Sequence, residues 1–195
     1  MDVIQRYVLK PKFNNLSEYR LSQKDILIYT TIRSFFNTQD NFCYPSYATI
    51  AKRSGTSVHI VTHSVKRLEC AGFIDVWKVG KFKRRHYYKF NDFDNYQKIP
   101  YSLFDADDLT AYEKSILLII AEYSNSLQQI PESIGELASK IGMTYRSLMP
   151  QIKSLILKGY VVLEVYENPL DQTLTKYFKL TVKLRWNFPV NSSTA

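Results

Sequence analysis

The stretch Tyr44-Pro-Ser-Tyr-Ala-Thr-Ile-Ala-Lys-Arg-Ser-Gly55 decides how the first half of this chain folds. Pro45 stands at the entrance of a short helix, where its missing N–H costs nothing. Gly55 suits the tight turn that ends this helix and leads into another. The next helix is expected from about Ser57 to Ala71, and Gly72 stops it. Two helices joined by a tight turn indicate a helix-turn-helix arrangement.

The sequence on either side completes a unit of three helices and a hairpin. Ser22 and Asp25 have the spacing of a capping box, in which a hydroxyl and a carboxylate satisfy free amides at a helix start. The apolar run Ile26 to Phe36 follows and predicts the first helix. After the third helix the apolar period changes to two, over Phe73 to Val79 and His86 to Phe90, which indicates a β-hairpin. This is the layout of a winged helix-turn-helix.

The same unit occurs twice along the chain. Ala51-Lys-Arg-Ser-Gly55 aligns with Ala138-Ser-Lys-Ile-Gly142 at a spacing of 87, and Gly72-Phe-Ile74 aligns with Gly159-Tyr-Val161 at the same spacing. Agreement at this many positions indicates a duplication. The second copy predicts a capping box at Thr110 and Glu113, helices at Ile116–Tyr123 and Tyr145–Lys158, and strands at Tyr160–Tyr166 and Thr175–Leu180.

We therefore predict an α+β, mainly helical fold of two tandem winged helix-turn-helix domains. Their boundaries are expected at residues 1–94 and 95–195, and the second domain is expected to end in a flexible C-terminal tail. Tyr7 to Lys12 and Gln97 to Tyr101 are each expected to add a leading strand to one domain.

The charge of the chain is unevenly distributed. The 195 residues carry a formal net charge of +8. Residues 1–95 hold 16 Lys and Arg against 8 Asp and Glu, whereas residues 96–195 hold 10 of each, so the first half carries the whole excess. A basic domain beside a neutral one indicates a polyanion partner for the first and a different task for the second.

The third helix of the first domain is expected to contact DNA. At about 100° per residue, one arc of this helix is apolar and should face the core: Val58, Val61, Val65 and Leu68. The opposite arc carries Thr56, His59, His63, Lys66, Arg67 and Cys70. Arg and Lys donate to guanine edges in the major groove, so this arc is typical of a recognition helix, with a merely solvated face as the alternative.

Basic residues also crowd the first hairpin. A polyanion would relieve their mutual repulsion, and a merely solvated loop is the alternative. Ser46, at the entrance of the second helix, can offer its hydroxyl and the helix amides to a phosphate. The complete set of expected double-stranded DNA contacts is Ser46, Lys52, Arg53, Thr56, Ser57, His59, His63, Lys66, Arg67, Lys78, Lys81, Lys83, Arg84 and Arg85.

The second domain departs from the first. Pro150 should kink its third helix, and its hairpin turn, Glu167-Asn-Pro-Leu-Asp171, is acidic. Apolar residues stand where the first domain is polar, which indicates a partner surface that includes Met149, Leu157 and Leu170. Because two-fold dimers are the commonest assemblies, we expect a homodimer. The rival interpretation is a second DNA contact through Lys140, Arg146 and Lys153.

Several other classes of protein are disfavoured. The longest apolar run, Ile116 to Ala121, is far shorter than the roughly 20 residues of a membrane helix. With two cysteines and no secretory signal, we expect a soluble protein of a bacterial or host cytoplasm, associated with the nucleoid. His59, His63 and Cys70 share a face, but a structural zinc site needs four ligands. We expect no metal, no cofactor and no catalysis.

The helix-turn-helix stretch, followed by Val65-Lys-Arg-Leu-Glu-x-x-Gly-Phe-Ile74, resembles the corresponding domains of phage and plasmid replication proteins. Two consecutive winged helices are also similar to plasmid replication initiators of the Rep type. That resemblance covers roughly residues 5–185 and implies that one domain binds DNA, while the other supports dimerisation or a further DNA contact. It also implies contact with the host replication or transcription machinery. A transcriptional regulator and a winged-helix protein-interaction scaffold are the alternatives.

Overall fold

The computed structural model describes residues 6–13, 16, 18–80, 85–124, 129–130, 133–167, 174–184 and 186. Its fold is mixed α and β. The N-terminal unit contains β1 (Tyr7–Pro11), α1 (Gln23–Arg33), α2 (Tyr47–Ser54), α3 (Val58–Cys70), β2 (Ile74–Val79) and β3 (Arg85–Phe90). The C-terminal unit contains β4 (Tyr96–Pro100), α4 (Ser102–Asp105), α5 (Ala111–Tyr123), β5 (Gln129–Ile130), α6 (Ile134–Lys140), α7 (Tyr145–Leu157), β6 (Val161–Glu167), β7 (Leu174–Leu180) and the short 3-10 helix η1 (Val182–Leu184).

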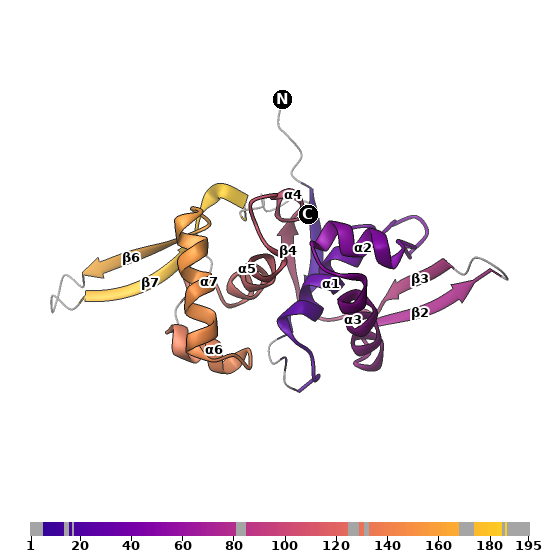
Figure 1. The fold of residues 1–195 in the computed structure, drawn as a ribbon, viewed down its shortest axis with the longest axis horizontal. Coiled ribbons are helices and arrows are strands. Elements are labelled where there is room, and N and C mark those ends of the chain that lie inside the picture. Colours follow the sequence, from indigo (N-terminus) through magenta and orange to yellow (C-terminus); the bar gives the residue numbers. More distant parts are fainter. Residues whose placement is uncertain are drawn as a thin grey trace, which may run out of the picture.

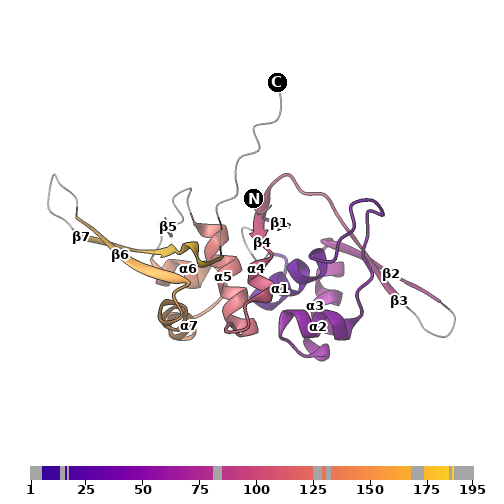
Figure 2. The same ribbon diagram turned by 90° about the horizontal axis from the view of Figure 1, so that it is seen from above.

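The two units lie side by side along the longest axis of the molecule. Helices α1 and α5 form the centre, with α2 and α3 on one side and α6 and α7 on the other (Figure 1). The β2–β3 and β6–β7 hairpins extend from opposite ends, as Figure 2 also shows. The predicted hairpins are therefore present, and they are far apart.

The predicted leading strands form, and they pair with each other. Strands β1 and β4 are antiparallel, with Tyr7 opposite Pro100, Leu9 opposite Lys98 and Pro11 opposite Tyr96. Both strands have the sequence Tyr-x-x-x-Pro, and the two copies are 89 residues apart. The Tyr of each strand is opposite the Pro of the other, so the pairing is symmetric about its centre. The two predicted strands are therefore present, and their pairing with each other joins the two units.

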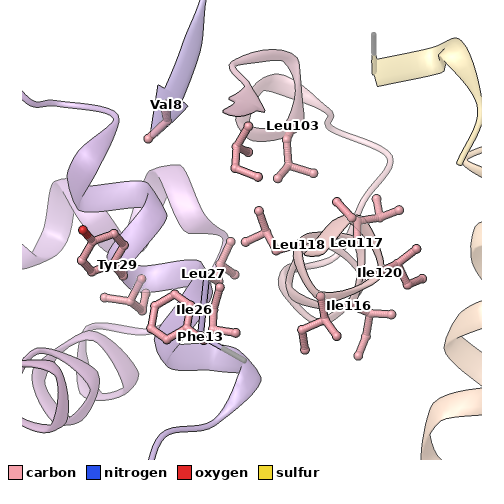
Figure 3. Packing of buried hydrophobic residues seen from close by; sticks show 14 of the residues in the cluster. Val8, Phe13, Ile26, Leu27, Tyr29, Leu103, Ile116, Leu117, Leu118 and Ile120 are labelled. Carbon is pink, nitrogen blue, oxygen red and sulfur yellow. The ribbon is translucent and has the colours of Figure 1, made fainter. Parts of the chain in front are cut away.

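One hydrophobic core runs through both units. In α1 every residue from Asp25 to Ile32 is buried, and in α5 every residue from Glu113 to Ala121 is buried. A helix that is apolar on all sides belongs inside a fold, and here each of the two helices covers the other. Figure 3 shows Leu27 of α1 and Leu118 of α5 between these helices, with Val8 and Leu103 beside them.

Local signals in the sequence are confirmed at several helix ends. Capping boxes close the starts of α1, at Ser22 and Asp25, and of α5, at Thr110 and Glu113. Gly55 has a φ of 71°, a left-handed conformation that glycine adopts without strain and that lets α2 turn sharply into α3. Within the described part of the chain, no helix is long and apolar enough to cross a membrane.

Candidate nucleic-acid interface

Helix α3 presents a polar face to solvent. Ser57 caps its start by accepting a hydrogen bond from the backbone N–H of Ile60 at 3.3 Å. The buried side is formed by Val61, Ser64, Val65 and Leu68. The predicted core position of Val58 is wrong, because this side chain is 47% exposed in the first turn of the helix. The first turn therefore begins outside the core.

The exposed face of α3 carries most of the side chains predicted there. These are His59, His63, Lys66, Arg67 and Cys70, with Thr62 half-buried beside them. The Nε2 atoms of His59 and His63 lie 3.1 Å apart, so a hydrogen bond joins the two rings. This pair and Lys66 provide donors and acceptors on one helical surface, which is what the reading of base edges requires.

Arg67 has a partner that sequence reasoning missed. Its guanidinium forms a bidentate ion pair with Asp25, with Nη2 to Oδ1 at 2.7 Å and Nε to Oδ2 at 3.0 Å. Asp25 is fully buried, whereas the Arg67 side chain is 42% exposed. The only sequence signal was Asp25 itself, which we interpreted as a helix cap. A DNA contact by Arg67 stays a prediction, but its guanidinium is already paired with Asp25.

The residues predicted around α2 divide between two surroundings. Ser46 is the N-cap of α2, and its hydroxyl accepts a hydrogen bond from the backbone N–H of Thr49 at 3.1 Å. Ser46 and Lys52 are both exposed. Thr56 is half-buried and is hydrogen-bonded to Ser54 at 2.7 Å. Ser46 and Lys52 are thus open to a ligand at the two ends of α2.

Arg53 instead belongs to the junction between the units. Its guanidinium carbon lies 5.3 Å from the ring centroids of Phe35 and Phe104 and 5.6 Å from that of Tyr101. Asp105 is 3.8 Å away, and the Arg53 side chain is 27% exposed. Because these three rings come from both units, the cation–π contacts of Arg53 stabilise the junction between the units. Its role in contacting DNA stays a prediction.

An open cavity of about 690 Å³ lies beside Arg53, between α2 and the start of α5. Lys52, Asp105, Asp107 and Lys114 line it with charges of both signs. Burial lowers the pKa of Lys114, whose ammonium donates to the carbonyl oxygen of Phe104 at 3.1 Å. The cavity lies away from the exposed face of α3 and belongs to the unit junction.

The basic hairpin is described only in part. Lys78, Arg85 and Lys89 are exposed on its strands. The predicted contacts Lys81, Lys83 and Arg84 lie outside the described residues. On the side that faces α2, His86 stacks on Tyr47, with ring centroids 4.4 Å apart and planes at 13°. Burial, and then the nearby charge of Lys78, lower the pKa of His86, so this imidazole is held toward its neutral form.

The predicted partner surface of the C-terminal unit is likewise mixed. Leu157 is 89% exposed at the end of α7. Met149 is half-buried and packs against the core, which is not the outward position predicted for it. Leu170 lies outside the described residues. Helix α7 is continuous through Pro150, and the rival DNA-contact residues Arg146 and Lys153 are exposed on it.

Comparison with known proteins agrees with the geometry of the N-terminal unit. The family model of a helix-turn-helix domain matches residues 19–74, which run from just before α1 to the first residue of β2. No curated protein matches the sequence. Among the residues that the structure describes, no three His, Cys, Asp or Glu side chains gather as a metal site. Residues 19–74 thus match a helix-turn-helix domain, and such a domain suggests DNA binding.

Proposed function

We propose that the protein is a duplex-DNA-binding replication initiator or organiser of a phage or plasmid, built from two tandem winged helix-turn-helix domains. One observation carries the proposal: the exposed imidazole and ammonium groups of α3 share a unit with the basic β2–β3 hairpin, inside the half of the chain that holds the whole net charge of +8. The helix-turn-helix match at residues 19–74 supports it.

In this proposal the two parts of the N-terminal unit have different tasks. Lys66 donates to guanine O6 or N7 in the major groove, and His59 and His63 read neighbouring base edges. Ser46 and Lys52 on α2, with Lys78 and Arg85 on the hairpin, contact phosphates and set the register without reading sequence. Both tasks agree with the exposure of these side chains.

The C-terminal unit serves assembly in this proposal. Its charge is balanced, and the exposed Leu157 offers an apolar contact to a second copy of the chain. A homodimer would match palindromic or repeated DNA sites. The protein then acts at the nucleoid as a binding protein rather than an enzyme, needs no cofactor, and brings host replication proteins to its site. Arg146 and Lys153 are exposed on α7 and support a second DNA contact as the rival role.

Selection of bound fragments from a random duplex library, followed by titration at several salt concentrations, tests the proposal. We expect a defined consensus and a steep loss of affinity with salt, because Lys and Arg contacts release counterions. Lys66→Ala should weaken binding, whereas Lys24→Ala, which removes an exposed charge from α1, should not. No duplex binding at roughly 50 mM salt would contradict the proposal. A plasmid that carries the selected site and replicates only when the protein is supplied would separate replication from transcriptional regulation.

A further inference from the structure

Four aromatic rings gather on one face of the β2–β3 hairpin. Trp77 and Tyr87 are cross-strand partners, with ring centroids 5.7 Å apart and planes at 16°. Phe42 and Tyr44 come from the segment before α2, and their centroids lie 5.5 Å and 5.7 Å from that of Tyr87. We call these four side chains the aromatic platform. Its members are distant along the chain, so no local sequence pattern reveals it.

The aromatic platform is open to solvent and faces away from α2. Paired backbone hydrogen bonds between Cys43 and Tyr88 hold the segment with Phe42 and Tyr44 along β3. Successive side chains of a strand point to opposite faces, so Tyr87 points away from Tyr88, which is buried in the core. Tyr44 is 54% exposed and Trp77 is 38% exposed. Two of the four rings are thus exposed, and backbone hydrogen bonds hold the segment with Phe42 and Tyr44 to β3.

Stability of the hairpin is the ordinary explanation for such a cluster, because cross-strand aromatic pairs stabilise sheets. The C-terminal unit argues against that explanation. In its hairpin, Glu164 and Tyr177 are opposite each other at the positions of Trp77 and Tyr87. There Tyr177 is hydrogen-bonded to Glu164 and to Gln129, which takes the place of Phe42. The same hairpin therefore forms with polar side chains, and the fold does not require an aromatic platform.

Basic side chains flank the rings. Arg85 and Lys89 stand two residues before and after Tyr87, so they lie on the same face of β3, and both are exposed. An aromatic surface flanked by two cations, with one acidic side chain, Asp75, opposite Lys89, suits a nucleic-acid strand whose bases are free to stack, because every base has a π-face and every nucleotide a phosphate. In a duplex those π-faces are covered by neighbouring bases.

We propose that the aromatic platform binds single-stranded DNA, with unpaired bases stacked on Tyr44 and Trp77 and phosphates held by Arg85 and Lys89. This site goes beyond the duplex contact of α3 and shares only Arg85 with the phosphate contacts proposed for the hairpin. A protein partner is the other occupant that exposed aromatic side chains can take. The excess of positive charge in residues 1–95 favours the nucleic acid.

Tryptophan fluorescence tests the proposal directly, because the chain has two tryptophans and only Trp77 belongs to the platform. In a Trp186→Phe background, oligothymidylate should quench the fluorescence of Trp77, because its bases stack on the indole ring. We choose a length of about 12 nucleotides, since single-strand sites of OB-fold proteins cover roughly 4–16 nucleotides. An abasic oligonucleotide of the same length carries the same phosphates and should bind more weakly, with no quenching. Tyr44→Ala and Tyr44→Leu should each weaken oligothymidylate binding by about 5-fold to 150-fold.

Tyr177→Ala provides the matched control, because it removes the corresponding ring from the other hairpin and should leave oligothymidylate affinity unchanged. Circular dichroism of each variant checks that it folds, and Tyr44→Leu keeps apolar bulk while it removes the π-face. Equal binding of the abasic strand, or unchanged affinity in both Tyr44 variants, would overturn the proposal. Absence of quenching together with altered sedimentation of the Tyr44 variants would identify a protein-docking surface instead. Duplex affinity, measured in parallel, should not change with Tyr44, so failure of the duplex site is distinguishable from failure of this one.

Discussion

Arg67 of α3 donates two hydrogen bonds to the carboxylate of Asp25 in α1, from Nη2 to Oδ1 at 2.7 Å and from Nε to Oδ2 at 3.0 Å. The same carboxylate accepts from the backbone N–H of Ser22 at 2.7 Å, so it closes the start of α1 and fixes α3 against it. The C-terminal unit repeats this arrangement. Glu113 accepts from the Thr110 N–H at 2.7 Å and from Ser154, the residue 87 positions after Arg67, at 2.6 Å. In both units a capping carboxylate thus sets the position of the third helix.

Arg67→Ala should lower the free energy of unfolding by about 2 kcal/mol, because it leaves the buried Asp25 carboxylate without its cation. The figure is below that for a fully buried pair, since the Arg67 side chain is 42% exposed. Urea denaturation measures it. Lys66→Ala, which removes the preceding exposed charge, should change stability by no more than a few tenths of a kcal/mol. Equal stability of the two variants would show that the ion pair contributes nothing net.

Sequence preference should depend on His63 and Lys66 more than on Arg67, because the Arg67 guanidinium is held by Asp25. Lys66→Ala should relax one position of a selected consensus and cost roughly 1–3 kcal/mol there. Binding-site selection with each variant measures the change. A consensus that relaxes for Arg67→Ala and not for Lys66→Ala would mean that DNA displaces Asp25 from the ion pair.

The hairpin should instead govern affinity for all sequences alike. Arg85→Ala should weaken binding to specific and random duplexes by the same factor and reduce the salt slope by about 1, as expected for a phosphate contact. Anisotropy titrations at four salt concentrations measure the slope. Lys98→Ala, on the inter-unit ribbon, is the matched control and should keep the slope of the unaltered protein. An unchanged salt slope in Arg85→Ala would show that Arg85 does not contact the DNA phosphates.

Glu113 should make the stability of the C-terminal unit depend on acid pH. Burial raises its pKa, but hydrogen bonds from Lys158, Ser154 and Thr110 outweigh burial and lower the pKa from 4.5 to about 2. The unfolded chain therefore binds a proton first as the pH falls, so stability is complete above about pH 4.5 and is lost toward pH 2. The shift corresponds to about 3 kcal/mol.

Glu113→Gln isolates this contribution. Its stability should be lower than that of the unaltered protein at neutral pH, and the difference should disappear as the pH approaches 2. Urea melts at steps between pH 2 and 6 measure both effects. Glu136→Gln serves as the control, because Glu136 also closes a capping box, at Ser133, but lies on the surface. A constant difference between Glu113→Gln and the unaltered protein at every pH would contradict the assignment.

Local signals predicted the elements of this fold well, and long-range pairings were beyond them. Capping boxes and the left-handed Gly55 depend on residues a few positions apart, and the structure has them where the sequence indicates. The ribbon of β1 with β4 joins strands 89 residues apart, and nothing within either strand says which partner it takes. Periodicity alone places Arg67 on a recognition face, and position beside Ser46 alone suggests a DNA contact for Arg53. Their acidic and aromatic partners lie on other elements, and only the fold brings those groups together.

Two of the most exposed apolar side chains of the C-terminal unit lie near the end of α7. Leu157 is 89% exposed, and Val182 in η1 is 82% exposed. The ammonium of Lys183 donates to the carbonyl oxygen of Lys158 at 2.8 Å, which holds η1 against the end of α7 and brings these two side chains to the same region. If a second copy covers this region, these two side chains are the ones that it would contact.

Leu157→Glu should therefore abolish self-association of the full chain without unfolding it, because the leucine makes little contact inside its own molecule. Analytical ultracentrifugation across protein concentrations measures the association, and urea melts measure stability.

Met149→Glu is the contrasting variant. Met149 is half-buried and packs against the core, so replacing its apolar contacts with a charge should lower stability by about 1–3 kcal/mol, whatever the assembly state. Duplex affinity of a monomeric Leu157→Glu variant for a single site should remain, while cooperative binding to a double site is lost. A chain that sediments as a monomer at every concentration, with Leu157→Glu indistinguishable from it, would show that this surface does not bind a second copy.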